Sequence, residues 1–173
     1  MQLTVLVQGW YESSEEFAQV AAVAERLRDH LGGGEMARLV TELNQPGASS
    51  ALIQRTFLQF ARDLGFRDES KGLFAEYDNS ALRPDYFMPL GATGILMEVE
   101  RGKTTINNMD LLDFWKCHLC EHAQYLFLLV PTALRQNPVA RPRNEYIAVT
   151  RRLRTFFVPR NYTNVRGAFV FGY

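Results

Sequence analysis

Three acidic residues in the middle of this chain have the types and positions to hold a divalent cation. Glu98 and Glu100 lie two residues apart in the run GILMEVERGKTT, residues 94–105, which begins like a buried strand. Side chains alternate between the faces of a strand, so both glutamates point the same way, about 7 Å apart. Asp85 begins the preceding predicted strand, and a hairpin would bring it beside Glu98. Three converging carboxylates would suit a hard cation such as Mg²⁺.

The same alternation predicts what each face of this strand meets. Glu98 and Glu100 share a face that we expect to look into a cleft. The opposite face is wholly apolar and is expected to belong to the core, through Ile95, Met97 and Val99. The alternative interpretation makes both glutamates solvated residues of an edge strand and Asp85 a turn residue.

The elements around these acids predict an α/β fold with a central mixed sheet flanked by helices. An amphipathic helix is capped by Ser49 or Ser50 and stopped by Gly65. In chain order there follow strands over 86–88 and 94–101, a helix capped by Asn107 or Asn108 over about 109–122, and a buried strand over 125–130. This order requires at least one crossover connection.

The rest of the chain extends this core within one predicted domain, residues 1–173. The N-terminal helical part, 1–48, has a strand or extended arm over 3–7 and a helix that begins with a capping box of Ser13 and Glu16. Three glycines, 32–34, suggest a flexible joint after that helix. The predicted core covers 49–131, and the C-terminal part, 132–173, has a basic helix over 145–157 and a strand over 167–171.

Charge is segregated along a chain whose formal net charge is zero. Residues 124–173 contain eight arginines and one acidic residue, a net charge of +7, which leaves −7 on the remainder. Such asymmetry favours a polyanionic partner, because arginines neutralise phosphates and release counterions. The candidate nucleic-acid contacts are Arg101, which follows the two glutamates, and the C-terminal Arg151, Arg152, Arg154 and Arg160. The competing interpretation is a solvated helix face.

The arrangement of motifs over residues 49–131 resembles the PD-(D/E)xK nuclease superfamily, with its restriction-endonuclease-like fold. The resemblance rests on an amphipathic helix, then Pro84-Asp85 at the start of one strand, then Glu98-Val99-Glu100 on the next. A helix and a buried strand follow. Glu100 stands where the superfamily has its lysine, as in some type II restriction enzymes. Lys103 is the first candidate for the displaced cation, and Lys116 is the second.

The resemblance implies a Mg²⁺-dependent DNA endonuclease, with Mn²⁺ as a possible substitute, in restriction or defence. Asp85, Glu98 and the carbonyl of Val99 would be the metal ligands. Glu100 would hold or deprotonate the attacking water, and Lys103 or Arg101 would stabilise the phosphorane. Since one site cuts one strand, a homodimer is expected. A non-catalytic nucleic-acid-binding or assembly subunit with a degenerate nuclease fold is the alternative, because the usual lysine is missing.

Other features of the sequence are interpreted more simply. The only cysteines lie with two histidines in the segment Lys116-Cys-His-Leu-Cys-Glu-His122; helical spacing would allow zinc, but we expect buried thiols and exposed imidazoles. Asn107, Asn108, Asp110 and Asp113 are expected to cap a helix and favour its dipole, and Gln54 to be solvated. No Walker A motif indicates a nucleotide cofactor. We expect no membrane partner and a cytoplasmic location.

Overall fold

A mixed six-stranded sheet organises the part of the chain that the structure describes. The computed structural model describes residues 1–68, 72–78, 80, 82–102, 104–135, 137 and 139–173. The strands pair in the order β1 (Gln2–Val7), β6 (Gly167–Gly172), β5 (Tyr125–Val130), β4 (Thr93–Val99), β3 (Tyr86–Leu90) and β2 (Arg67–Asp68). The central three, β6, β5 and β4, are parallel, and the outer pairs are antiparallel. The predicted mixed α/β sheet is confirmed.

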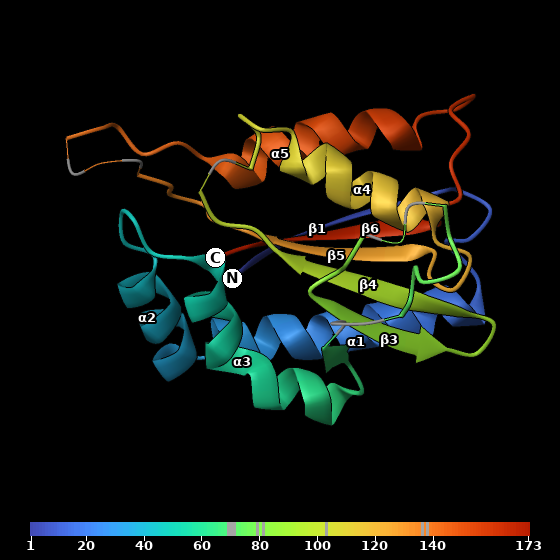
Figure 1. Cartoon of the computed structure of the whole chain (residues 1–173), viewed down its shortest axis with the longest axis horizontal. Coiled ribbons are helices and arrows are strands. Elements are labelled where there is room, and N and C mark those ends of the chain that lie inside the picture. Colours follow the sequence, from blue (N-terminus) through green and yellow to red (C-terminus); the bar gives the residue numbers. More distant parts are fainter. Residues whose placement is uncertain (69–71, 79, 81, 103, 136, 138) are drawn as a thin grey trace.

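Helices cover both faces of this sheet (Figure 1). One face is covered by α1 (Glu15–Gly32), α2 (Gly34–Leu43) and α3 (Ser50–Leu64). The other face is covered by α4 (Met109–Leu119) and α5 (Glu145–Arg154). Strand β1 from the N-terminal part pairs along its whole length with β6 from the C-terminal part, so the three predicted parts of the chain share one sheet.

Strand β4 is therefore buried on both faces. Met97 and its neighbours on that face pack against α1 and α3, and Leu96 packs in the layer beneath α4. Glu98 has only 3% of its surface exposed. The predictions of an open cleft over the glutamate-bearing face, and of a solvated edge strand as its alternative, are both wrong for Glu98. The crossover helix that links parallel strands β4 and β5 covers this face.

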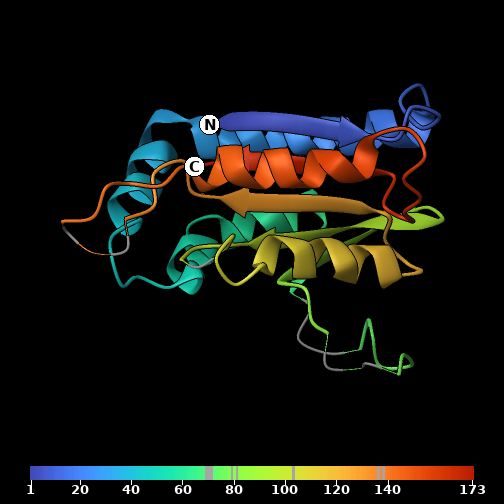
Figure 2. The ribbon, with the colours of Figure 1, turned by 90° about the horizontal axis from the view of Figure 1, so that it is seen from above.

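The parallel strands give the molecule two distinct edges. We call the edge where β4, β5 and β6 end the carboxyl edge, and the opposite one the amino edge. Helices α4 and α5 each connect two of these strands, so they run antiparallel to the strands and begin at the carboxyl edge. Figure 2 shows α5 lying along the parallel strands in this way. The start of α5 is thus near the ends of the strands, and its last turn is at the amino edge.

Some predicted helix ends differ from those observed. Helix α1 is capped by Ser14, whose hydroxyl accepts a 3.0 Å hydrogen bond from the Phe17 N–H. The predicted capping box of Ser13 and Glu16 is therefore wrong. A turn in which the Ser14 N–H donates to the Tyr11 carbonyl delays the start of the helix by one residue. The carboxylate of Glu16 instead accepts hydrogen bonds from distant parts of the chain.

The remaining boundaries follow the sequence signals closely. Gly65 ends α3 with a φ of 106°, a conformation that favours glycine. Only Gly33 separates α1 from α2, so the triple glycine forms a tight corner. Helix α4 follows Asn108 as expected but ends at Leu119, short of the predicted 122. The predicted basic helix is α5 followed by a short 3₁₀ turn, Thr155–Phe157.

Candidate metal centre at the end of strand β4

The β3–β4 hairpin brings Asp85 beside Glu98. Its register pairs Tyr86 with Met97, which sets the preceding Asp85 opposite Glu98. The Asp85 N–H donates to Glu98 Oε2 at 3.2 Å, and the Val99 N–H donates to Asp85 Oδ2 at 2.8 Å. The two carboxylates thus share one end of the hairpin, as the sequence predicts. Burial raises the pKa of Asp85, and the side chain of Gln54, on α3, opposes this shift; Gln54 is half-buried rather than solvated.

Lys116 supplies the cation that faces Glu98. It projects from α4, and its Nζ lies 2.8 Å from Glu98 Oε1 and 2.9 Å from Asp113 Oδ1. A longer contact of 3.4 Å reaches the carbonyl of Arg83. The first candidate from sequence, Lys103, lies outside the described residues. Lys116, the second candidate, is the lysine that the described structure places in the site.

Asp113 is a member of the site, although its sequence position predicts only capping of the helix and interaction with its dipole. Its side chain is fully buried, and its second oxygen, Oδ2, has no hydrogen-bond partner among the described residues. The i,i+3 spacing of Asp113 and Lys116 on one predicted helix was the available signal. It did not indicate which way that helix face would point.

Acid outweighs base in this site. We call Asp85, Glu98, Glu100 and Asp113 the acidic cluster. Burial, followed by repulsion from Asp113, raises the pKa of Glu98 well above its ordinary value, although Lys116 opposes the shift. Burial and the charges of Asp113 and Asp85 raise the pKa of Glu100 to about 8. The cluster therefore holds more negative charge, when ionised, than one ammonium group balances.

The other members show the same tension between burial and charge. Burial raises the pKa of Asp113 to about 6, against the attraction of Lys116. Burial also raises the pKa of Asp85, while its hydrogen bond from Val99 opposes the shift. Burial of Lys116 disfavours its charged form. The combined attraction of Glu98 and Asp113 outweighs this effect and raises the pKa of Lys116. A further cation would relieve this excess of negative charge.

The expected convergence of three carboxylates is not observed. Within the described residues, no group of three Asp, Glu, His or Cys side chains is placed to hold a metal ion. Lys116 engages one oxygen of Glu98, and Asp85 is turned towards the Val99 N–H. These packing contacts with α4 and with the neighbouring main chain could not be derived from strand alternation.

A smaller oxygen set remains compatible with Mg²⁺. In an extended strand the N–H and C=O of one residue point to the same side, so the carbonyl of Val99 faces the side on which its N–H meets Asp85. Asp85, Glu98 and this carbonyl are all hard oxygen donors. Mg²⁺ in enzymes is commonly held by one or two carboxylates, with waters and substrate phosphate completing its shell. The donors present fit that pattern.

Arg101 lies directly after the acidic strand and is partly enclosed. Its Nη1 donates to the carbonyl of Ala48 at 2.6 Å, while its buried Nε and Nη2 have no hydrogen-bond partner among the described residues. The Tyr173 hydroxyl donates to the carbonyl of Glu100 at 2.8 Å and fixes the main chain here. Arg101, which follows Glu100 in the chain, thus has buried N–H donors that no described residue uses.

Arg152 is occupied by contacts inside the molecule. Its guanidinium donates to the Thr105 carbonyl at 2.9 Å and to Asn108 Oδ1 at 2.6 Å, and it lies 3.3 Å from the buried carboxylate of Asp110. The loop between β4 and α4 is thereby held against α5. Arg152 therefore joins α5 to this loop, which differs from the predicted contact with phosphate. The difference arises because its partners are far away in the sequence.

Two of the other predicted phosphate contacts, Arg154 and Arg160, lie away from the acidic cluster. Arg151, Arg154 and Arg160 are exposed and form no ion pair or hydrogen bond through their side chains within the described part of the chain. Arg154 ends α5, and Arg160 follows it, so both are at the amino edge. A helix of this length places them about 15 Å along the sheet from the end where β4 stops.

The cysteine–histidine segment has a structural role in the described chain. Cys117 and Cys120 are buried free thiols, as predicted. His118 is half-buried, with its Nδ1 3.1 Å from Thr163 Oγ1 and accepting from the Asn164 N–H at 3.1 Å, which corrects the prediction of an exposed imidazole. His122 is exposed. These contacts anchor the segment that leads into β6.

Metal-free protein should become less stable as pH rises from about 5 to about 8. The pKa of Glu100 is about 8 in the folded protein, against an ordinary 4.5. Between these values the folded state holds more protons than the unfolded chain, so this residue's contribution to the free energy of unfolding falls with rising pH. Urea denaturation at several pH values measures the slope, and added Mg²⁺ should raise stability most at the alkaline end.

The variant Glu100→Gln tests whether Glu100 causes this pH dependence of stability. It cannot titrate, so its stability should fall less steeply over the same pH range than that of the unaltered protein. An identical pH dependence in both proteins would contradict the raised pKa of Glu100.

The fold and the site together define an α/β protein with a partly buried acidic cluster and one paired lysine at the end of a central strand. Comparison with protein-family models and with curated proteins found no match for this chain. None of the helices in the described ranges is both long and apolar enough to cross a membrane.

Proposed function

We propose that this protein is a Mg²⁺-dependent endonuclease that hydrolyses phosphodiester bonds in DNA. The observation that carries the proposal is the meeting of Asp85, Glu98 and Lys116 at the end of a two-stranded hairpin. The element order also supports it: α3, then antiparallel β2, β3 and β4, then α4 and a strand parallel to β4. This is the order expected of a restriction-endonuclease-like core.

In this proposal the protein groups bind, orient and exchange protons around a phosphodiester. Asp85, Glu98 and the Val99 carbonyl would hold Mg²⁺, which when bound lowers the pKa of water and offsets phosphate charge. Glu100 has a pKa of about 8 in the metal-free protein, close to the range where a carboxylate can accept a proton from water efficiently. Lys116 keeps the Glu98 carboxylate in one orientation.

Positive charge for the phosphate would come from Arg101. Its buried Nε and Nη2 atoms have no hydrogen-bond partner among the described residues, and a guanidinium in a dry site interacts strongly with an anion. The proposal includes Mn²⁺ as a substitute metal, no nucleotide cofactor, and a restriction or defence role. Because one site cuts one strand, it also includes a homodimer, which light scattering after size-exclusion chromatography would test.

The proposed activity predicts nicking or linearisation of supercoiled plasmid DNA. Incubation with Mg²⁺ or Mn²⁺ should convert the plasmid, and excess EDTA should stop conversion. A parallel preparation of Glu98→Gln excludes a contaminating nuclease, because a contaminant would cleave equally in both preparations. Absence of cleavage across plasmids and genomic DNAs of varied sequence, with both metals, would contradict the proposal.

The alternative is a non-catalytic nucleic-acid-binding or assembly subunit. It is favoured by the pairing of Glu98 with Lys116 and by the lack of three converging acidic side chains within the described residues. Salt-sensitive DNA binding without any metal-dependent cleavage would support this alternative.

A further inference from the structure

An arm of irregular chain leaves the sheet next to the acidic cluster. We define the arm as the described residues of 131–144, between β5 and α5. The strand before it ends beside β4, where the Glu100 N–H donates to the carbonyl of Leu129 at 2.9 Å. The arm therefore starts two residues beyond the partner of Glu100. Figures 1 and 2 both show it projecting past the strand ends at the carboxyl edge.

The base of the arm is held in a defined shape. Leu134 and Arg143 form an antiparallel bridge with two hydrogen bonds of 2.8 Å, and Leu134 is buried. The Arg143 side chain lies 3.2 Å from Thr105 Oγ1 and 3.4 Å from Glu145. These contacts attach the arm to the loop that follows β4, so its position is coupled to that of the candidate site.

A local turn shapes the outer part of the arm. Asn137 Oδ1 accepts hydrogen bonds from the N–H groups of Val139 and Ala140, at 3.1 Å and 2.8 Å. This is the pattern of an Asx turn, which orders a chain reversal without help from the rest of the fold. Val139 is 93% exposed near the tip.

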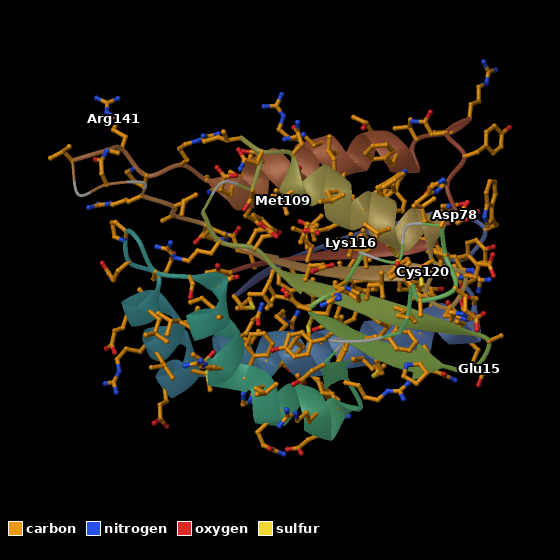
Figure 3. All side chains as sticks on the ribbon, in the orientation of Figure 1. Glu15, Asp78, Met109, Lys116, Cys120 and Arg141 are labelled. Carbon is orange, nitrogen blue, oxygen red and sulfur yellow. The ribbon has the colours of Figure 1, made fainter. Side chains whose placement is uncertain are left out.

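The charge of the arm is of one sign. Residues 131–144 include three arginines and no acidic residue. Arg143 is partly engaged at the base, whereas Arg135 and Arg141 are exposed, with no side-chain ion pair or hydrogen bond in the described structure. Figure 3 shows Arg141 directed away from the body of the protein. Mutually repelling cations held on a projecting element favour an anionic ligand.

We propose that this arm is the phosphate-binding clamp that holds duplex DNA against the acidic cluster, with Arg135 and Arg141 as its contacts. This inference rests on the proposed function for the identity of the ligand. The acidic cluster repels the DNA backbone, so a cationic element at the same edge is needed to hold DNA there. From the bridge at Leu134 to the tip the arm can reach about 13 Å. Duplex DNA carries one charge per about 1.7 Å, so that reach passes several phosphates.

The exposed arginines of α5 provide a matched comparison. The double variant Arg135→Gln/Arg141→Gln and the control Arg151→Gln/Arg154→Gln each remove two exposed positive charges with no described partner. Binding of a fluorescent duplex is measured by anisotropy in EDTA between about 50 and 200 mM salt, so that cleavage plays no part. The arm variant should bind at least about tenfold more weakly at low salt, and its slope of log K against log salt should fall by about 2. The α5 variant should lose less affinity and less salt dependence than the arm variant.

Each other outcome has a defined meaning. The clamp would be overturned if the arm variant kept the affinity and salt slope of the unaltered protein. It would also be overturned by a larger loss of affinity in the α5 variant, or by no DNA binding by the unaltered protein. Loss of binding in the arm variant alone, combined with no cleavage by the unaltered protein in Mg²⁺, would uphold the clamp and reject the endonuclease. Both variants should have the melting temperature of the unaltered protein, which would show that they are folded.

Discussion

Replacing Asp85 with Asn or Glu98 with Gln should lower the rate of DNA cleavage at least about a thousandfold. Both changes keep the shape of the side chain and remove its charge. Asp85 and Glu98 are the two carboxylates that meet at the hairpin end, and each supplies an anionic oxygen that an amide cannot replace in holding Mg²⁺. Single-turnover cleavage of a plasmid at saturating Mg²⁺ measures the effect.

DNA binding should survive these changes. Removing negative charge near the proposed phosphate path should leave affinity in EDTA unchanged or higher, because the positive charges of the arm are retained. Glu12→Gln is the matched control: Glu12 is exposed and forms no ion pair within the described residues, so cleavage should proceed at the unaltered rate. Cleavage at the unaltered rate in both Asp85→Asn and Glu98→Gln would refute the assigned site.

Replacing Lys116 with Met should lower the free energy of unfolding by about 3–5 kcal/mol near pH 8. The Nζ of Lys116 lies within 3 Å of two buried carboxylates, Glu98 and Asp113. Without the ammonium group these carboxylates either remain charged without a partner or take up protons. Urea denaturation measures the loss, and Arg26→Met, which removes an exposed charge from α1, should change stability very little.

The deficit of Lys116→Met should depend on pH in a defined direction. Loss of the cation raises the pKa of Glu98 and Asp113 further in the folded state, so that state binds more protons than the unfolded chain above about pH 4. Stability of the variant therefore falls as pH rises, and the deficit is smaller near pH 5 than near pH 8. Adding Glu98→Gln to the variant should recover part of the loss, because one unpaired charge is removed. A pH-independent deficit would show that lost packing of the lysine stem is its cause.

The hairpin is the part of the candidate site that the sequence predicted best. Alternation, a Pro-Asp pair at the start of one strand and an acidic pair on the next were enough to place Asp85 beside Glu98. Strand pairing between neighbouring segments is governed by a short turn and by the apolar pattern, which are both local. The mixed α/β sheet was predictable for a related reason, since its strands and helices have strong periodicity.

The cations were placed less well. Lys103 was preferred because it is close in sequence to Glu100, whereas Lys116 reaches Glu98 from a helix that packs across the strand. Arg152 was expected to face a ligand but joins α5 to the loop after β4. Long, flexible side chains take their partners from whatever packs nearby, and their own sequence neighbourhood carries little information about that.

The sequence by itself determined the alternation of β4, the hairpin and the segregation of charge along the chain, because each depends on local periodicity or on composition. Only the tertiary structure decided that both faces of β4 are buried, that Lys116 pairs with Glu98 and Asp113, and that the arm shares an edge with the acidic cluster. The physical reason is that crossover helices and loops are positioned by contacts between residues far apart in the chain. Burial, pKa and the pairing of charges all follow from those contacts.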